Sequence, residues 1–388
     1  MHSGKAVFAQ LVAGIHPEHF RRWVTRYHGH YKVQHFSCWD QFLAMAFAQV
    51  TFRESLADIE VCLRSRRGQL YHLGFRSVVA HSTLAEANRS RDWRIYADLA
   101  AGLIRRARTL YGAEPLGLEL AHTLYALDST TIDLCLSLFP WARFRTTKAA
   151  IKLHTLLDLR GPIPTMIAIS EGKQADVRAL DELPLEPGAF YVMDRGYVDF
   201  VRLYRFTLAA AFFVTRTKAG IQLNRLESRP VDRSTGLRSD HIVWPATATS
   251  AAHYPERLRR VSYRDPEDGK VLVFLTNNFE LPALVIAQLY KLRWRVELVF
   301  KWIKRNLRIK HCFGTRENTV KTQEWIAMCA YVLAAIHRKE HRVALSLPQR
   351  LQIVSVTAFS QTPLVALVAN ISSHDETAMP PNQWRLWD

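Results

Sequence analysis

The chain has 388 residues, of which 48% are hydrophobic, and this length and composition predict a globular protein of two or three domains with a sizeable core. Its 52 Lys and Arg residues outnumber 35 Asp and Glu residues, and the net charge of +17 predicts a polyanionic partner, with nucleic acid as the first candidate. An anionic membrane surface is the alternative, but the sequence contains neither a basic amphipathic terminus nor a lipidation motif.

Cysteines, histidines and apolar runs indicate where the protein works. The 5 cysteines are odd in number and form no Cys-x-x-Cys pair, which predicts reduced thiols in a cytoplasmic protein. The 16 histidines have no matching cysteine set, so we expect surface or DNA-facing residues in place of a zinc site. The amino terminus lacks a signal peptide, and the apolar runs at 208–214 and 326–336 are too short to span a bilayer. No phosphate-binding loop is present, so no nucleotide cofactor is implied.

The first part of the chain, residues 1–112, predicts a helical DNA-binding domain. Apolar residues recur with helical spacing over 39–50 and 55–63, and Thr-Leu-Ala-Glu at 83–86 reads as a capping box that starts another helix. Arginines and aromatic residues mix over 64–94, which suits a helix lying in a groove of DNA. A plain helical domain with solvated arginines is the alternative interpretation.

Residues 120–312 predict an α/β domain, since short apolar strands now alternate with helical segments. A short apolar run leads into Asp128, residues 151–159 and 163–170 read as a two-stranded hairpin, and a strand at 190–193 runs directly into Asp194. Within this domain, residues from about 206 to 275 read as a β-rich insertion. Residues 313–388 predict a helical carboxy-terminal region followed by a polar tail.

The segment YKLRWRVELVFKWIK, residues 290–304, has no Gly or Pro and predicts one continuous helix. On such a helix one face carries a single acid, Glu297, among several bases: Arg293, Lys301 and Lys304. The face is either a solvated surface with ordinary ion pairs four residues apart, or a site that binds an external anion. A phosphodiester together with a metal ion would satisfy both kinds of charge.

Two aspartates stand in similar settings upstream of Glu297. Asp128 and Asp194 each follow a short apolar run, where an aspartate commonly forms a turn or a helix cap. Three carboxylates from separate elements can instead converge on divalent metal, and two such ions can bind the attacking and leaving oxygens of one phosphodiester. Asp176, in a loop after the hairpin, is the strongest substitute for one of them.

The motifs LDST at 127–130 and DRGY at 194–197, with Tyr290, Arg293, Glu297 and Lys304 at spacings of two, three and six intervening residues, resemble a known family. They are similar to those of bacterial insertion-sequence transposases of the DDE class with the YREK signature. The resemblance implies a ribonuclease H-like core with a β insertion. It also implies that two Mg²⁺ ions, replaceable by Mn²⁺, bind Asp128, Asp194 and Glu297, and that the DNA contacts are Tyr290, Arg293, Lys304, Arg195 and Lys301.

The same resemblance implies an activity and its partners. We expect a transposase that cleaves the ends of its own element and joins the 3′ ends to target DNA, acting on terminal inverted repeats as a homodimer. A catalytically inactive repressor that binds the ends and a metal-dependent nuclease of the same fold are the alternatives. Some members carry a tryptophan in the insertion that stacks on a flipped base; Leu272 stands there in this chain, which leaves a DNA hairpin step in doubt.

Overall fold

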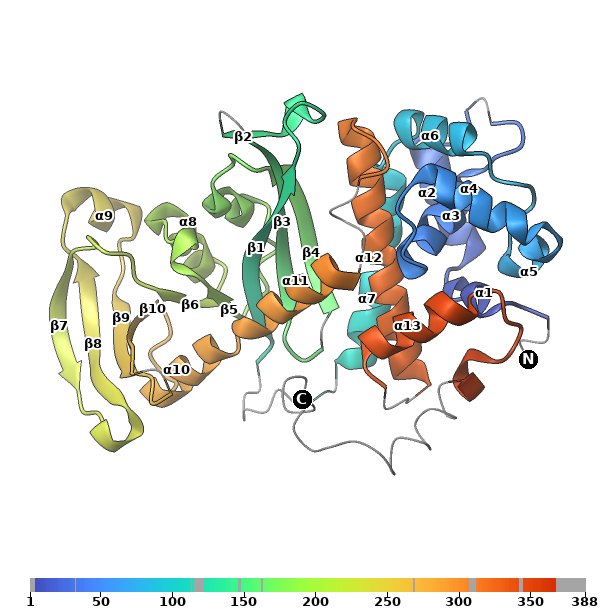
Figure 1. Ribbon diagram of the computed structural model, residues 1–388. Helices are drawn as coiled ribbons and strands as arrows, with labels where there is room; N and C mark the ends of the chain where they lie inside the picture. Colours follow the sequence, from blue (N-terminus) through green and yellow to red (C-terminus); the bar gives the residue numbers. More distant parts are fainter. Residues whose placement is uncertain are drawn as a thin grey trace. The chain divides into compact units, whose positions relative to one another are not determined.

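A computed structural model describes residues 4–31, 33–112, 114, 122–145, 148–161, 163–267, 269–306, 312–341 and 345–367 (Figure 1). The chain divides into two compact units, one formed by Met1–Tyr111 with Lys301–Asp388 and the other by Gly112–Phe300. The polar tail that we expect beyond residue 367 lies outside the described residues. Within the described part, no helix combines the length and the apolar character needed to cross a membrane.

The first unit is helical and is built around its longest helix. That helix, α12, is buried along nearly its whole length between Thr319 and Ile336, so it forms the centre of this unit. Small residues such as Ala327 and Ala330 let neighbouring helices approach it closely. The helices of the unit are α1 (Val7–Val12), α2 (Pro17–Arg26), α3 (Cys38–Val50), α4 (Leu56–Ser65), α5 (Leu70–Leu73), α6 (His81–Ser90), α7 (Arg94–Tyr111), α12 (Glu317–Glu340) and α13 (Leu347–Thr357).

The helices expected over 39–50 and 55–63 are confirmed by α3 and α4, each of which a serine side chain caps. The capping box expected at 83–86 is wrong. Helix α6 already begins at His81, and its N-terminal residue, Ala80, has no side chain that can cap it. The Thr-x-x-Glu pattern therefore lies inside the helix, where the backbone N–H groups are satisfied by the helix itself.

The second unit contains one mixed sheet in the order β2-β3-β1-β5-β6-β10-β9-β8-β7, with β4 paired to β3. Strand β1 is antiparallel to β3 and parallel to β5, which is in turn parallel to β6. The strands β7 to β10 are all antiparallel to their neighbours. The strands are β1 (Leu124–Leu134), β2 (Arg143–Arg145), β3 (Lys148–Asp158), β4 (Ile163–Glu171), β5 (Phe190–Met193), β6 (Phe212–Arg216), β7 (Leu223–Arg229), β8 (Leu237–Pro245), β9 (Leu258–Arg264) and β10 (Val271–Thr276).

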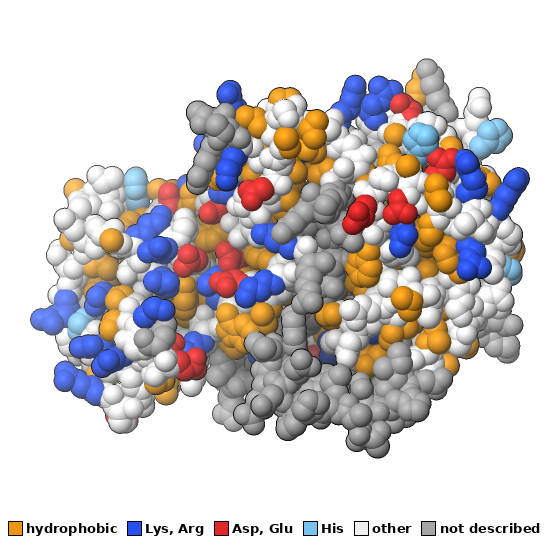
Figure 2. Space-filling view, viewed as in Figure 1, with side chains coloured by type: hydrophobic (Ala, Val, Ile, Leu, Met, Phe, Trp, Pro, Cys, Tyr) orange, Lys and Arg blue, Asp and Glu red, His pale blue; other side chains and the backbone are white. Residues whose placement is uncertain are grey.

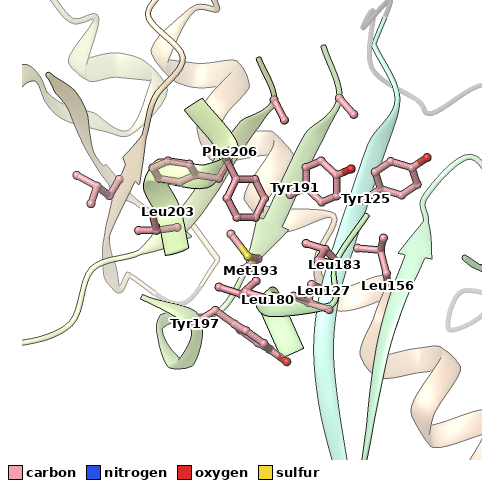
Figure 3. Close-up of a cluster of buried hydrophobic side chains, with 14 of the residues drawn as sticks. Tyr125, Leu127, Leu156, Leu180, Leu183, Tyr191, Met193, Tyr197, Leu203 and Phe206 are labelled. Atoms are coloured by element: carbon pink, nitrogen blue, oxygen red, sulfur yellow. The ribbon is translucent and has the colours of Figure 1, made fainter. Parts of the chain in front are cut away.

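The helices of this unit cover the sheet on both faces. A buried cluster joins Leu127, Met193 and Leu275 of the strands to Leu203 and Phe206 of α8 (Figure 3). Side chains alternate along a strand, so Phe274 points to the opposite face, where its ring lies 4.8 Å from that of Tyr290 on α10. The helical segments are α8 (Phe200–Leu208), α9 (Ala248–His253), α10 (Ala283–Lys291) and α11 (Trp294–Asn306), with short turns η2 (Pro140–Ala142), η3 (Asp176–Asp181), η4 (Arg195–Tyr197) and η5 (Arg233–Thr235).

Most of the expected strands are present, with one informative difference. The hairpin expected at 151–159 and 163–170 is confirmed by β3 and β4, and β5 runs into Asp194 as expected. Asp128, however, does not end its strand: β1 continues to Leu134 because its pairing with β3 extends to Ala149. The polar residues after Asp128 are tolerated in a strand because the hydrogen bonds of the ladder do not depend on side chains.

A buried ion pair fastens the strands β8 and β9 to the segment that leads into α10. Arg259 donates to both carboxylate oxygens of Asp240 at 2.7 and 2.8 Å, and their side chains are only 3% and 4% exposed. The same guanidinium donates to the carbonyl of Leu281 at 2.6 Å. Leu281 lies two residues before Ala283, the first residue of α10, so the pair helps to fix where that helix begins.

Replacing Asp240 by asparagine is therefore expected to destabilise the fold strongly. Removing one partner leaves a buried guanidinium without its counter-charge, which costs about 3–5 kcal/mol of unfolding free energy. Glu267→Gln is a matched control, because the Glu267 carboxylate pairs with Lys291 at the surface and is 83% exposed. Denaturant unfolding measures both changes; a loss for Asp240→Asn no larger than for the control would contradict this account.

Candidate active site

Residues 290–304, which we call the YREK segment, are predicted by their composition to form one helix. The structure divides them between two helices. Helix α10 ends at Lys291 and α11 begins at Trp294, and Leu292 and Arg293 form a turn between them. Through this turn the backbone N–H of Arg293 bonds to the carbonyl three residues back, at 3.1 Å, as in a tighter helix. Tyr290 and Glu297 therefore lie on different helices, with Arg293 at the junction.

Arg293 joins two carboxylates that are far apart in the sequence. Its guanidinium donates to Asp128 at 2.6 Å and to Glu297 at 2.7 Å. A guanidinium can do this because its N–H groups form a rigid planar fork. The Arg293 side chain is 16% exposed, and its Nε is buried without a hydrogen-bond partner. One cation thus holds the acid of β1 beside the acid of α11.

Tyr290 links the third carboxylate, that of Asp194, to Arg293. The tyrosine hydroxyl donates to Asp194 at 3.0 Å, and the guanidinium carbon of Arg293 lies 5.7 Å from the centre of the tyrosine ring. The hydroxyl of Thr215 on β6 donates to the backbone carbonyl of Asp194 at 3.2 Å, which fixes the start of the following turn. Tyr290 and Arg293 are neighbours, so together they gather all three acids.

The strand register explains why the two aspartates meet. Leu127 on β1 lies directly beside Met193 on the parallel strand β5, so Asp128 and Asp194 follow at equivalent positions on neighbouring chain segments. Adjacent strands are about 4.8 Å apart. Leu127 and Met193 point into the buried cluster with α8, and the next residues point to the face that α10 covers. The alternation of side chains therefore delivers both acids to Tyr290 and Arg293.

Three carboxylates meet at this site, and Arg293 pairs with two of them. Burial raises the pKa of Asp128 to about 6, and the nearby carboxylates of Glu297 and Asp194 push in the same direction. Arg293 and the backbone N–H of Ser129, which donates to Asp128 at 2.8 Å, only partly oppose this rise. Burial likewise raises the pKa of Tyr290 to about 12, so its hydroxyl stays protonated and donates to Asp194. A further cation beside these acids would be stabilised.

The three acids supply the oxygen ligands that a hard divalent cation requires. In the described part of the chain, no three His, Cys, Asp or Glu side chains are arranged to hold a metal ion at once. The contacts explain this, because Arg293 occupies oxygens of Asp128 and Glu297 while Tyr290 occupies one of Asp194. The donor set fits a divalent ion, provided that the guanidinium gives up the two carboxylates.

The remaining residues predicted for the site lie outside this network. Arg195 is exposed in η4, directly after Asp194. Lys301 is exposed and Lys304 is half-buried on α11, in the stretch that belongs to the helical unit. The expectation that Arg293 shares one face of a continuous helix with Glu297, Lys301 and Lys304 is wrong, since Arg293 precedes the first residue of α11.

Sequence reasoning missed a polar network next to the first aspartate. One oxygen of Asp176 accepts hydrogen bonds from the hydroxyl of Ser129 at 2.9 Å and from Lys152 at 3.0 Å. Asp176, considered above as a substitute ligand, is thus neutralised by a lysine and braces the residue after Asp128. The available signal was Lys152 itself, a charged residue between the buried apolar residues Ile151 and Leu153 of β3, because a lysine that is largely removed from solvent requires a partner. Arg216, at the end of β6, was also missed; its charge acts on Tyr290.

A basic chain whose sheet gathers three acids around an arginine and a tyrosine is typical of enzymes that act on nucleic-acid phosphodiesters. The chain belongs to the transposase DDE domain family, whose pattern matches residues 119–333. It is a DNA-transposing enzyme of the bacterial insertion-sequence class, as the motifs predict. Residues 3–76 match a domain of unknown function, DUF4372.

Individual relatives agree with this assignment. A Sinorhizobium fredii protein named "Putative transposase y4zB" is 30% identical over 73% of this chain and 79% of its own length. A Geobacillus stearothermophilus protein named "Probable transposase for insertion sequence element IS5377" is 32% identical over 56% of this chain and 57% of its own. The solved piggyBac transposase synaptic complex with hairpin DNA aligns with 99% of this chain and 80% of its own, at 10% identity and a TM-score of 0.43, which is too low to support an argument.

Proposed function

We propose that this transposase cleaves the ends of its insertion sequence and joins the freed 3′ ends to target DNA, using two Mg²⁺ ions held by Asp128, Asp194 and Glu297. The observation that carries this proposal is the gathering of these three acids around Arg293 and Tyr290. Mn²⁺ is expected to substitute for Mg²⁺, because it too prefers carboxylate ligands. The double-stranded partners would be the terminal inverted repeats and the target, with no nucleotide cofactor.

The strand order supports a ribonuclease H-like core. The strands β4-β3-β1-β5-β6 are neighbours in that order, with β1 antiparallel to β3 and parallel to β5. The resemblance implies such a core for residues 120–312 with a β-rich insertion at about 206–275. Strand β6 falls within those bounds but is parallel to β5, so we assign only β7 to β10 to the insertion. We assign residues 1–112 to DNA binding and residues 313–388 to a helical region beside them. The protein would act as a homodimer that holds two ends together.

In this proposal the bound ions would stabilise charge on the attacking and leaving oxygens of the phosphodiester. The chain's own residues have separable tasks. The three carboxylates bind and orient the ions, and Tyr290 keeps Asp194 in position through its hydroxyl. Arg293, once it leaves Asp128 and Glu297, can direct its fork to a DNA phosphate. Arg195, Lys301 and Lys304 would contact the DNA backbone.

The experiment that tests the proposal uses the full chain and DNA that carries the sequences flanking its gene. With Mg²⁺, we expect cuts at the inverted repeats followed by joined products on a target plasmid. Binding to the ends without any cut, in Mg²⁺ or Mn²⁺, would replace the proposal with an end-binding repressor. Cut ends that are never joined would replace it with a nuclease.

A further inference from the structure

Two arginines and a histidine lie on one side of the sheet formed by β7, β8 and β9. His241 on β8 lies opposite Arg260 on β9 and opposite Ser228 on β7. Val243 lies two residues after His241 on β8, and side chains two residues apart on a strand share a face. Arg225 lies opposite Val243, so it shares that face too. Arg225, His241 and Arg260 therefore occupy one face of three neighbouring strands, which we call the cationic face.

The acids of these strands lie on the other face. Asp240 is adjacent to His241 and so points away from it, into the buried pair with Arg259. Glu227 lies opposite Ile242, also on the other side. No acid in the described part of the chain forms an ion pair with Arg225 or Arg260. Burial and the charges of these two arginines lower the pKa of His241, which agrees with their closeness.

Arg225 and Arg260 give this face its positive charge, and no acid of the three strands lies beside them on it. Arg225 is exposed and Arg260 half-buried, so both guanidinium groups remain available to a partner. Lys and Arg side chains gather over the region in which Figure 1 draws β7 to β10 (Figure 2). A polyanion placed over this face would be attracted by both arginines.

We propose that the cationic face binds the phosphate backbone of double-stranded DNA. The proposal rests on the proposed function and extends it to a surface away from the candidate active site. Arg225 and Arg260 are two strand spacings apart, about 10 Å across the sheet, and are also offset along the strands by two residues, roughly 7 Å. A duplex presents several phosphates over such a distance, so each arginine can neutralise its own phosphate. Such contacts involve no bases, so they would increase the affinity of the protein for duplex DNA of any sequence.

The test measures how the affinity for DNA depends on salt. The full chain and its Arg225→Gln/Arg260→Gln variant are titrated with a duplex that lacks the element's ends, without divalent metal, at several NaCl concentrations. Each lost phosphate contact flattens the slope of log affinity against log salt by about 0.9. We expect a flatter slope for the double variant and roughly half of that change for Arg225→Gln alone, which alters only an exposed residue.

The matched control is Arg233→Gln/Lys173→Gln, which removes the same charge from exposed positions outside the cationic face. Its slope is expected to stay close to that of the wild type. An equal slope for the wild type and the double variant would overturn the proposal. So would a change of oligomeric state with unaltered DNA binding, which would assign the face to an acidic protein surface. Joined transposition products despite either result would show that the proposed function stands without this surface.

Discussion

Replacing Glu297 by glutamine is expected to lower strand cleavage by about a thousandfold or more while leaving DNA binding in place. Metal ions supply several kcal/mol of charge stabilisation to the transition state, and a neutral amide is a far poorer ligand than a carboxylate. The change preserves the size of the side chain. Its carbonyl can still accept the hydrogen bond that Arg293 now donates to Glu297 at 2.7 Å. Gel-based cleavage of end-carrying DNA measures the loss.

A matched control separates this effect from a general loss of acidity near the DNA. Glu317→Gln neutralises an exposed acid at the start of α12, where it pairs with Lys321. That variant should cleave at the wild-type rate. Retained cleavage by Glu297→Gln would remove this residue from the metal-binding set.

Replacing Arg293 by glutamine is expected to raise the affinity for divalent metal, measured without DNA, by about tenfold, a typical coupling between two linked binding events. The guanidinium occupies oxygens of Asp128 and Glu297, so an entering ion must displace it. The variant removes this competitor and also a nearby positive charge. Calorimetric titration with Mg²⁺, or with Mn²⁺ followed by its magnetic resonance signal, measures the change. Cleavage should nevertheless fall, because the same residue is needed for the phosphate.

Two further variants separate competition from simple charge removal. Lys301→Gln removes one exposed positive charge from α11, the helix that carries Glu297, and should leave metal affinity close to that of the wild type. Arg293→Lys keeps the charge but cannot form the fork with two carboxylates, and should give an intermediate affinity. An unchanged or weaker metal affinity in Arg293→Gln would contradict competition between Arg293 and a metal ion for Asp128 and Glu297.

The strands that carry the site were predictable because local patterns agree with their tertiary setting. The apolar run before Asp194 becomes β5, and the two runs around 151–170 become the hairpin β3–β4. Asp128 and Asp194 were expected to meet, but only the parallel register of β1 and β5 explains how. Register depends on contacts between distant segments, which one sequence does not display.

The break in the YREK segment was not predictable from its residues. Neither Gly nor Pro marks Leu292 and Arg293, and both residues favour helix. The turn is held by tertiary contacts, above all by the ion pairs of Arg293 with Asp128 and Glu297. The alternative interpretation of the segment, a solvated surface with ordinary ion pairs, is wrong for Arg293, because this side chain is largely buried. Lys152 and Asp176 were missed as a pair because their partnership also spans separate elements.

The central claim, that these three acids bind the metal ions used in strand cleavage, is tested most directly by exchanging one ligand for a softer one. Asp194→Cys replaces an oxygen ligand by sulfur, which disfavours Mg²⁺ more than softer divalent metals such as Mn²⁺. We predict that cleavage is lost in Mg²⁺ and returns in Mn²⁺, whereas Asp194→Ala stays inactive in both. Equal behaviour of the cysteine and alanine variants in the two metals would contradict the assignment of Asp194 as a ligand.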